Sequence, residues 1–122
     1  MHQHNLNQKI IGFSALKGTF QTSVINEYTT KSNFKIIDDY CFGGYAKIDL
    51  ELIRFINMVF EKTSIPLDPI YTGKMLFGIV DLIKKNYFSE NSKILVIHTG
   101  GLQGIEGFNN KLAKKNLELI TI

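Results

Sequence analysis

The segment SKILVIHTGG, from Ser92 to Gly101, carries the strongest structural pattern in this chain of 122 residues. Its four aliphatic residues, Ile94 to Ile97, are consecutive and do not alternate with polar residues. Such a run is typical of a parallel strand that is covered on both faces. The sequence therefore predicts a central strand over 92–98, a turn at Thr99-Gly100-Gly101, and a helix from about Gln103 to Lys115.

Helical periodicity precedes this predicted strand in two stretches. Apolar residues recur at helical spacing behind Asp49, whose side chain can cap the first free amides, and the pattern continues to Lys62. Pro66 and Pro69 interrupt it, because a proline disfavours the helical conformation of the residue before it. The second helix is expected from about Thr72 to Asn86, apolar nearly all round and therefore buried between layers.

Shorter elements are expected nearer the N-terminus. Lys9–Leu16 contains a short apolar run that predicts a strand, and Phe34–Ile37 predicts a second one. Gln21–Tyr28 is compatible with a short helix, and residues 117–122 with an edge strand or a tail. The order predicts an α/β fold with a mostly parallel sheet flanked by helices. Three strands are few for such a sheet, so the chain is expected to be part of a larger domain.

Composition restricts the function classes. Hydrophobic residues make up 44% and charged residues 20% of the chain, which is ordinary for one globular domain. The net charge is +3, and Lys111, Lys114 and Lys115 fit a solvated helix face better than a nucleic-acid surface. Cys41 is the only cysteine, and the polar start Met1–Asn5 does not resemble a signal peptide. We expect a soluble cytoplasmic chain with no metal site and no nucleic-acid or membrane partner.

Three turns contain candidate functional residues. His98-Thr99-Gly100-Gly101 follows the predicted central strand, where ligands bind in open α/β sheets. Asp68–Lys74 places a Tyr-Thr pair at the start of a helix, and Phe42–Tyr45 contains two glycines beside an aromatic residue. Each has a structural alternative, namely a strand-to-helix turn, a helix cap, or a turn with a packed aromatic.

Together these segments resemble a known family. The matching stretches are Pro66–Phe88 (PLDPIYTGKMLFGIVDLIKKNYF), Lys93–Phe108 (KILVIHTGGLQGIEGF), Phe42–Lys47 (FGGYAK) and Ile11–Gly18 (IGFSALKG). They resemble the C-terminal signature of pyridoxal-phosphate enzymes of the D-cysteine desulfhydrase and 1-aminocyclopropane-1-carboxylate deaminase family. The resemblance implies that residues 1–122 are the C-terminal part of the large cofactor-binding domain of a three-layer, tryptophan-synthase-β-like (fold type II) enzyme, without its N-terminal part and small domain.

The resemblance also implies roles for individual residues. Tyr45 and Tyr71 match two tyrosines placed around the substrate, and they are the catalytic candidates. Thr72 matches the residue that faces the pyridine nitrogen of the cofactor. Thr99, with Gly100, matches the wall beside the cofactor ring.

The substrate expectation depends on two of these positions. In the deaminases the Thr72 position resembles Glu and the Thr99 position resembles Leu, whereas the desulfhydrases resemble this chain in having threonine at both. A glutamate would hold a proton on the ring nitrogen and strengthen the electron sink, and a threonine hydroxyl carries no charge to do so. The pattern favours β-elimination from D-cysteine, which yields pyruvate, ammonia and hydrogen sulfide, over deamination of aminocyclopropane carboxylate.

The family's Schiff-base lysine and its glycine-rich phosphate loop lie upstream of the matched part. Lys17 and Lys74 match other family positions. The chain is therefore expected to be inactive alone, and its retention of pyridoxal phosphate is doubtful. The expected partners are a small amino acid and either a further copy of the chain or the missing N-terminal part of the enzyme. A small non-catalytic α/β module that binds a ligand or a protein remains the alternative.

Overall fold

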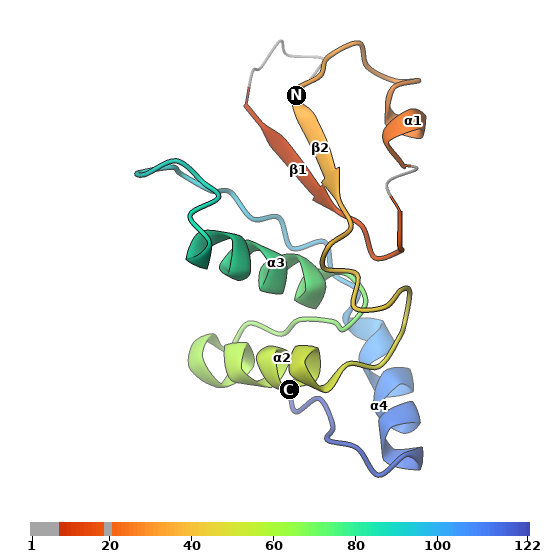
Figure 1. The fold of residues 1–122 in the computed structure, drawn as a ribbon. Coiled ribbons are helices and arrows are strands. Elements are labelled where there is room, and N and C mark those ends of the chain that lie inside the picture. The colour runs from red at the N-terminus through yellow and green to blue at the C-terminus, as the bar shows by residue number, and fades with distance from the viewer. Residues whose placement is uncertain (1–7, 19–20) are drawn as a thin grey trace.

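The computed structural model describes residues 8–18 and 21–122. The expectation for the polar N-terminal residues 1–5 lies outside these ranges. The described elements are β1 (Ile10–Phe13), α1 (Gln21–Ile25), β2 (Phe34–Ile37), α2 (Leu50–Thr63), α3 (Thr72–Lys84), a short 3₁₀ helix η2 (Leu102–Gly104) and α4 (Ile105–Lys114) (Figure 1). The α/β class is confirmed: a small parallel sheet is flanked by helices.

The sheet consists of β1 and β2, which run parallel and are connected through α1. Ile10 pairs with Phe34 at one end and Phe13 with Ile37 at the other. Helix α3 packs against β1, and Gly78 makes this close approach possible (Figure 1). A Cβ at Gly78 would come within 2.5 Å of the Phe13 ring and 2.8 Å of the Tyr40 ring. The strand predicted within Lys9–Leu16 is confirmed at Ile10–Phe13, and the strand predicted over Phe34–Ile37 is confirmed with the same bounds.

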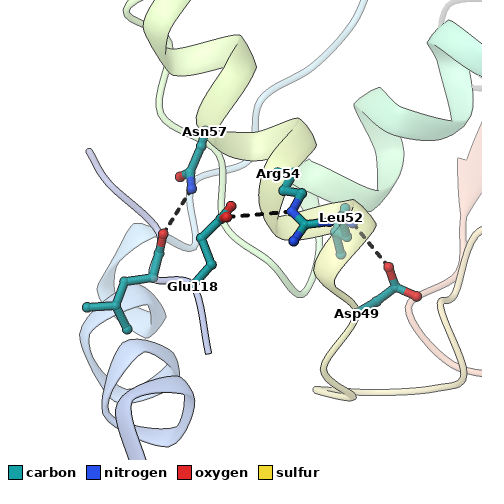
Figure 2. Close-up of polar contacts among 6 residues, drawn as sticks. Asp49, Leu52, Arg54, Asn57 and Glu118 are labelled. Atoms are coloured by element: carbon teal, nitrogen blue, oxygen red, sulfur yellow. Dashed lines mark hydrogen bonds and ion pairs between the residues drawn. The ribbon is translucent and has the colours of Figure 1, made fainter. Parts of the chain in front are cut away.

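Helix α2 begins as the sequence predicts. The Asp49 side chain accepts a hydrogen bond from the amide of Leu52 at 3.1 Å, which satisfies one of the free amides of the first turn (Figure 2). The apolar face of α2 forms the main core together with α4. The buried core residues are Leu52, Ile53, Ile56, Val59, Leu67, Ile105, Phe108, Leu112 and Ile120.

The C-terminal residues pack on α2 and α4 as a tail, and they do not form the edge strand that was the other expectation. The Asn57 side chain donates to the Leu119 carbonyl and accepts from the Thr121 amide, at 2.9 and 2.8 Å. The Asn109 side chain makes the same pair of bonds with Ile120. Figure 2 shows Asn57 bonded to this tail and Arg54 paired with Glu118 beside it. Two side-chain amides thus fix the tail by mimicking a strand neighbour.

The predicted central strand over 92–98 is wrong for the described residues. This stretch forms no strand and no helix, and Leu95 and Ile97 are 84% and 64% exposed. The aliphatic run correctly indicates a segment suited to burial, but a strand also needs hydrogen-bonding neighbours on its edges. Neither β1 nor β2 pairs with it. Helix α3 is likewise less covered than predicted, since Ile83 is 52% exposed.

None of the helices in the described ranges is both long enough and apolar enough to span a bilayer.

Candidate functional site

A pocket of about 320 Å³ opens at the carboxyl end of β1. Gly12 to Leu16 form one wall, where β1 ends and the chain turns toward α1. Tyr45 and Tyr71 form another part of the lining. The volume is at the lower end of the range for small-molecule sites, about 300–1,000 Å³. Its position agrees with the rule that ligands bind beyond the carboxyl ends of parallel strands.

Tyr45 and Tyr71 meet in this pocket. Their hydroxyl oxygens are 3.2 Å apart, and their rings are inclined at 62° with centroids 6.1 Å apart. Each residue is 49% exposed, so both remain accessible to a ligand. The hydrogen bond to Tyr45 raises the pKa of Tyr71, and burial and the nearby charges of Tyr45 and Asp68 raise it further. The Tyr71 hydroxyl therefore keeps its proton near neutral pH, and it can donate a hydrogen bond to a ligand.

Asp68 organises the first turn of α3. Its carboxylate accepts from the amides of Ile70, Tyr71 and Thr72, each at 2.8 Å, and from the Thr72 hydroxyl at 2.6 Å. The Thr72 hydroxyl in turn accepts from the Asp68 amide at 2.9 Å. Both side chains are 1% exposed. Asp68 was not predicted as a site residue, although an Asp-Pro pair just before a helix is a recognisable capping signal.

These bonds decide where Thr72 lies. Its hydroxyl is held by Asp68, and Thr72 does not line the pocket that contains the tyrosines. The role that the resemblance implies for Thr72, a contact with a cofactor ring, stays a prediction.

Thr99 and Gly100 belong to the turn at 98–101, which lies next to Asp68 through Gly101. Gly100 and Gly101 have φ angles of 93° and 90°, a conformation that favours glycine. A Cβ at Gly101 would lie 3.0 Å from the Asp68 carboxylate, so the turn packs directly on the start of α3. Neither Thr99 nor Gly100 lines the tyrosine pocket. The predicted roles of these two residues therefore also stay predictions.

His98 fixes this turn to the preceding loop. Its Nδ1 accepts from the Gly100 amide at 3.1 Å, so the neutral ring carries its proton on Nε2, which lies 2.8 Å from the Pro66 carbonyl. The structure thus joins the turns at 98–101 and 66–72 through His98 and Asp68. It joins the turn at 42–45 to Tyr71 through Tyr45.

Two further polar groups lie near the pocket and were not predicted as site residues. Lys74, in the first turn of α3, is 1% exposed, and its ammonium donates to the carbonyls of Gly44 and Ala15. Gln21 lines the pocket and donates to the Ser14 hydroxyl at 3.1 Å, while its buried Oε1 has no hydrogen-bond partner among the described residues. No sequence pattern marks either role, because both depend on tertiary contacts.

Comparisons with known proteins identify relatives over much of the chain, although no family model matches it. A Pyrococcus furiosus protein that carries the name of a 1-aminocyclopropane-1-carboxylate deaminase is 42% identical over 89 residues, which are 70% of this chain and 26% of that protein. A D-cysteine desulfhydrase from Klebsiella pneumoniae is 32% identical over 94 residues, 75% of this chain and 29% of the relative.

A solved structure shows that the fold is shared. The crystal structure of an aminocyclopropane-carboxylate deaminase homologue matches with a TM-score of 0.73 and 34% identity, over 85% of this chain and 34% of that one. The chain therefore spans only a quarter to a third of the length of these relatives. The matched residues are homologous to one part of the chain in 1-aminocyclopropane-1-carboxylate deaminases and D-cysteine desulfhydrases, which form one family.

Proposed function

We propose that this chain contributes the substrate-facing part of a pyridoxal-phosphate-dependent lyase or deaminase site that acts on a small amino acid. The observation that supports this most directly is the contact between Tyr45 and Tyr71, whose hydroxyls lie 3.2 Å apart at a pocket beyond the end of β1. Both tyrosines lie in segments that resemble the family, and the comparisons with named relatives support the same family.

The residues present fit the cofactor only in part. Pyridoxal phosphate supplies an electron sink for a carbanion at the substrate's α-carbon, and it is held through an amine. The described pocket offers an aliphatic and aromatic wall with hydroxyl donors, which suits a flat ring and a small amino acid. No lysine is among its lining residues, so the amine that an imine requires is not part of this pocket as described. We therefore assign no step of the reaction through the cofactor to this chain.

The role of the chain's own residues is binding and orientation. The paired hydroxyls of Tyr45 and Tyr71 can donate to a substrate carboxylate or to a leaving group. The raised pKa of Tyr71 keeps its proton available for donation, so it is suited to act as a donor and not as a base near neutral pH. Gln21 contributes to the same lining through its bond to Ser14, and its Oε1 is buried without a partner among the described residues.

We further propose D-cysteine as the preferred substrate class. Thr72 and Thr99 resemble the pattern of the desulfhydrases. An uncharged residue in place of glutamate suits the loss of a good leaving group such as a thiolate. Deamination of aminocyclopropane carboxylate is the second candidate, because the Pyrococcus furiosus relative named for that activity has the higher identity.

A chimera tests both proposals. The segment of the Klebsiella pneumoniae D-cysteine desulfhydrase that aligns with this chain would be replaced by this chain. The expected result is visible absorbance from bound pyridoxal phosphate and release of sulfide from D-cysteine. Tyr71→Phe in the chimera should lower kcat/KM by about tenfold or more, as expected for a lost hydrogen bond at the reacting substrate. Tyr28→Phe is the matched control, because Tyr28 is 79% exposed and lies outside the pocket.

Substrate choice is tested in the same chimera by the double substitution Thr72→Glu and Thr99→Leu. It should lower sulfide release from D-cysteine relative to ammonia release from aminocyclopropane carboxylate. A folded chimera that binds no pyridoxal phosphate, or that binds it and turns over neither substrate, would contradict the proposed function and favour a non-catalytic module. The sedimentation of the isolated chain would then show whether it associates with itself.

A further inference from the structure

Lys74 is a buried cation whose polar partners are backbone carbonyls. Its side chain is 1% exposed, and its ammonium donates to the Gly44 carbonyl at 3.0 Å and to the Ala15 carbonyl at 3.4 Å. It belongs to neither of the two ion pairs found in the described part of the chain. Burial lowers the pKa of Lys74, and the charges of Cys41 and Asp68 partly oppose this effect.

Burial of an ammonium without a carboxylate partner is unfavourable for folding. An apolar side chain of similar volume at the same place is often neutral or stabilising. Packing alone therefore does not account for a lysine here, whereas a need for N–H donors toward the two carbonyls does.

The two carbonyls belong to two different segments, each of which contributes residues to the pocket lining. Ala15 is in the wall that follows β1, and Gly44 immediately precedes Tyr45. Gly43 and Gly44 have φ angles of 86° and 131°, so this turn relies on glycine and has intrinsic conformational freedom. The backbone hydrogen bonds of Gly44 are local and long. Its amide donates to the Cys41 carbonyl at 3.2 Å, and its carbonyl accepts from the Lys47 amide at 3.4 Å. The bond from Lys74, at 3.0 Å, is shorter than both and connects this turn to α3.

We infer that Lys74 is a positioning residue: by binding the Gly44 carbonyl it holds Tyr45 against Tyr71, and through Ala15 it joins the two walls of the pocket. Its use in catalysis rests on the proposed function. The positioning itself is a property of this chain and is measurable without cofactor or substrate.

The pKa of Tyr71 reports this geometry, because the main cause of its rise is the hydrogen bond between the Tyr71 and Tyr45 hydroxyls. The experiment follows Tyr71 by NMR of the chain labelled with ¹³C at the tyrosine ring, with Tyr71→Phe for assignment. Lys74→Met should lower the pKa of Tyr71 by about as much as Tyr45→Phe does. Lys74→Met added to Tyr45→Phe should produce no further change, because the lysine acts through Tyr45.

The sign of the shift separates positioning from charge. If Lys74 affected Tyr71 only as a nearby positive charge, its removal would raise the pKa of Tyr71, since a cation favours the tyrosinate. A role in packing alone would change the unfolding midpoint and leave the titration of Tyr71 as it is. Lys84→Met is the matched control on the same helix, where the lysine is exposed, and it should leave the Tyr71 titration unchanged.

Lys74→Gln guards against a variant that does not fold. It keeps an amide donor without the charge, so it should lie between the wild type and Lys74→Met. A folded Lys74 variant in which the pKa of Tyr71 is unchanged or raised would overturn the inference. If neither variant folds, the wild-type chain provides the test by ¹⁵N NMR. The ammonium protons of Lys74 should exchange slowly with solvent, and fast exchange would overturn the inference as well. Absence of activity in the chimera would count against the proposed function only.

Discussion

Asp68 is predicted to be the most sensitive polar residue for the stability of this fold. Its carboxylate accepts four hydrogen bonds, three from amides at the start of α3 and one from the Thr72 hydroxyl, at 2.6–2.8 Å. Asp68→Ala leaves these donors without their acceptor, and the two donors of Thr72 are buried while the amides of Ile70 and Tyr71 are partly buried. Each buried donor that loses its partner costs about 1–3 kcal/mol, and neighbouring losses add less than fully. We expect a loss of about 3–4 kcal/mol.

Asp49→Ala is the matched control, because it removes the same side chain from the start of the other long helix. Asp49 accepts one side-chain hydrogen bond, from Leu52 at 3.1 Å, so its removal should cost about 1 kcal/mol. Asp68→Asn should be intermediate, since its amide keeps one acceptor oxygen and presents an NH₂ group to the remaining donors.

Urea unfolding followed by circular dichroism measures these differences. With a total stability of about 5–15 kcal/mol for a domain, the loss expected for Asp68→Ala is a large fraction of the whole. Comparable slopes of the unfolding curves would show that the variants differ in stability and not in compactness. A shift for Asp68→Ala no larger than that for Asp49→Ala would refute the role given to Asp68.

Three further predictions follow from other contacts. Gly78→Ala should destabilise the chain by about 1–3 kcal/mol, because its Cβ would come within 2.5 Å of the Phe13 ring. Gly107→Ala in α4 has open space around its Cβ and should stabilise the chain by about 0.5–1 kcal/mol, and urea midpoints measure both variants. The pKa of Tyr40 is raised to about 12, mainly by burial and by its hydrogen bond to Asp81, so the free energy of unfolding should fall as pH rises from 10.0, the ordinary tyrosine value, toward about 12. Tyr40→Phe should remove this alkaline fall. It should also reduce the loss of stability below pH 3.8, because the pKa of Asp81 is lowered first by the hydrogen bond from Lys85 and then by that from Tyr40; urea unfolding across pH checks both. Leu95 is 84% exposed within the hydrophobic run 94–97, so Leu95→Asp should change the free energy of unfolding by less than about 0.5 kcal/mol and should reduce self-association in sedimentation velocity. An unchanged sedimentation profile would show that this run does not mediate association.

Local patterns were sufficient to predict much of the fold. The helix behind Asp49 is marked by a capping residue and by apolar periodicity, and both signals concern residues within one helical segment. The short strands at 10–13 and 34–37 are marked by apolar runs between polar or glycine-containing turns. These elements could be predicted because each signal lies within its own segment, although the contacts that stabilise them, such as the pairing of Ile10 with Phe34, join segments that are distant in sequence.

The run over 94–97 shows why the same approach fails elsewhere. A row of aliphatic side chains indicates that a segment is suited to burial, but it does not contain the partner strand that would form its hydrogen bonds. Lys74 and Gln21 are a second case, since their partners Gly44 and Ser14 are reached only after folding. The contact between Tyr45 and Tyr71 is different, because the family resemblance singled out both residues and the structure brings their hydroxyls to 3.2 Å.

Asp68 and Lys74 together explain how the first turn of α3 presents Tyr71 to the pocket. Both are buried charges of opposite sign, and both are satisfied mainly by backbone groups: Asp68 by the amides of residues 70–72, where α3 begins, and Lys74 by carbonyls of two loops. Each therefore fixes backbone position while its own side chain stays away from the pocket lining. The polar side chain that reaches the pocket from this turn is the hydroxyl of Tyr71, half exposed and paired with Tyr45. In such a site the buried charges hold the backbone in place, and neutral hydroxyl donors contact the ligand. The effect of substituting Asp68 or Lys74 should therefore be measured first on the pKa of Tyr71 and only then on activity.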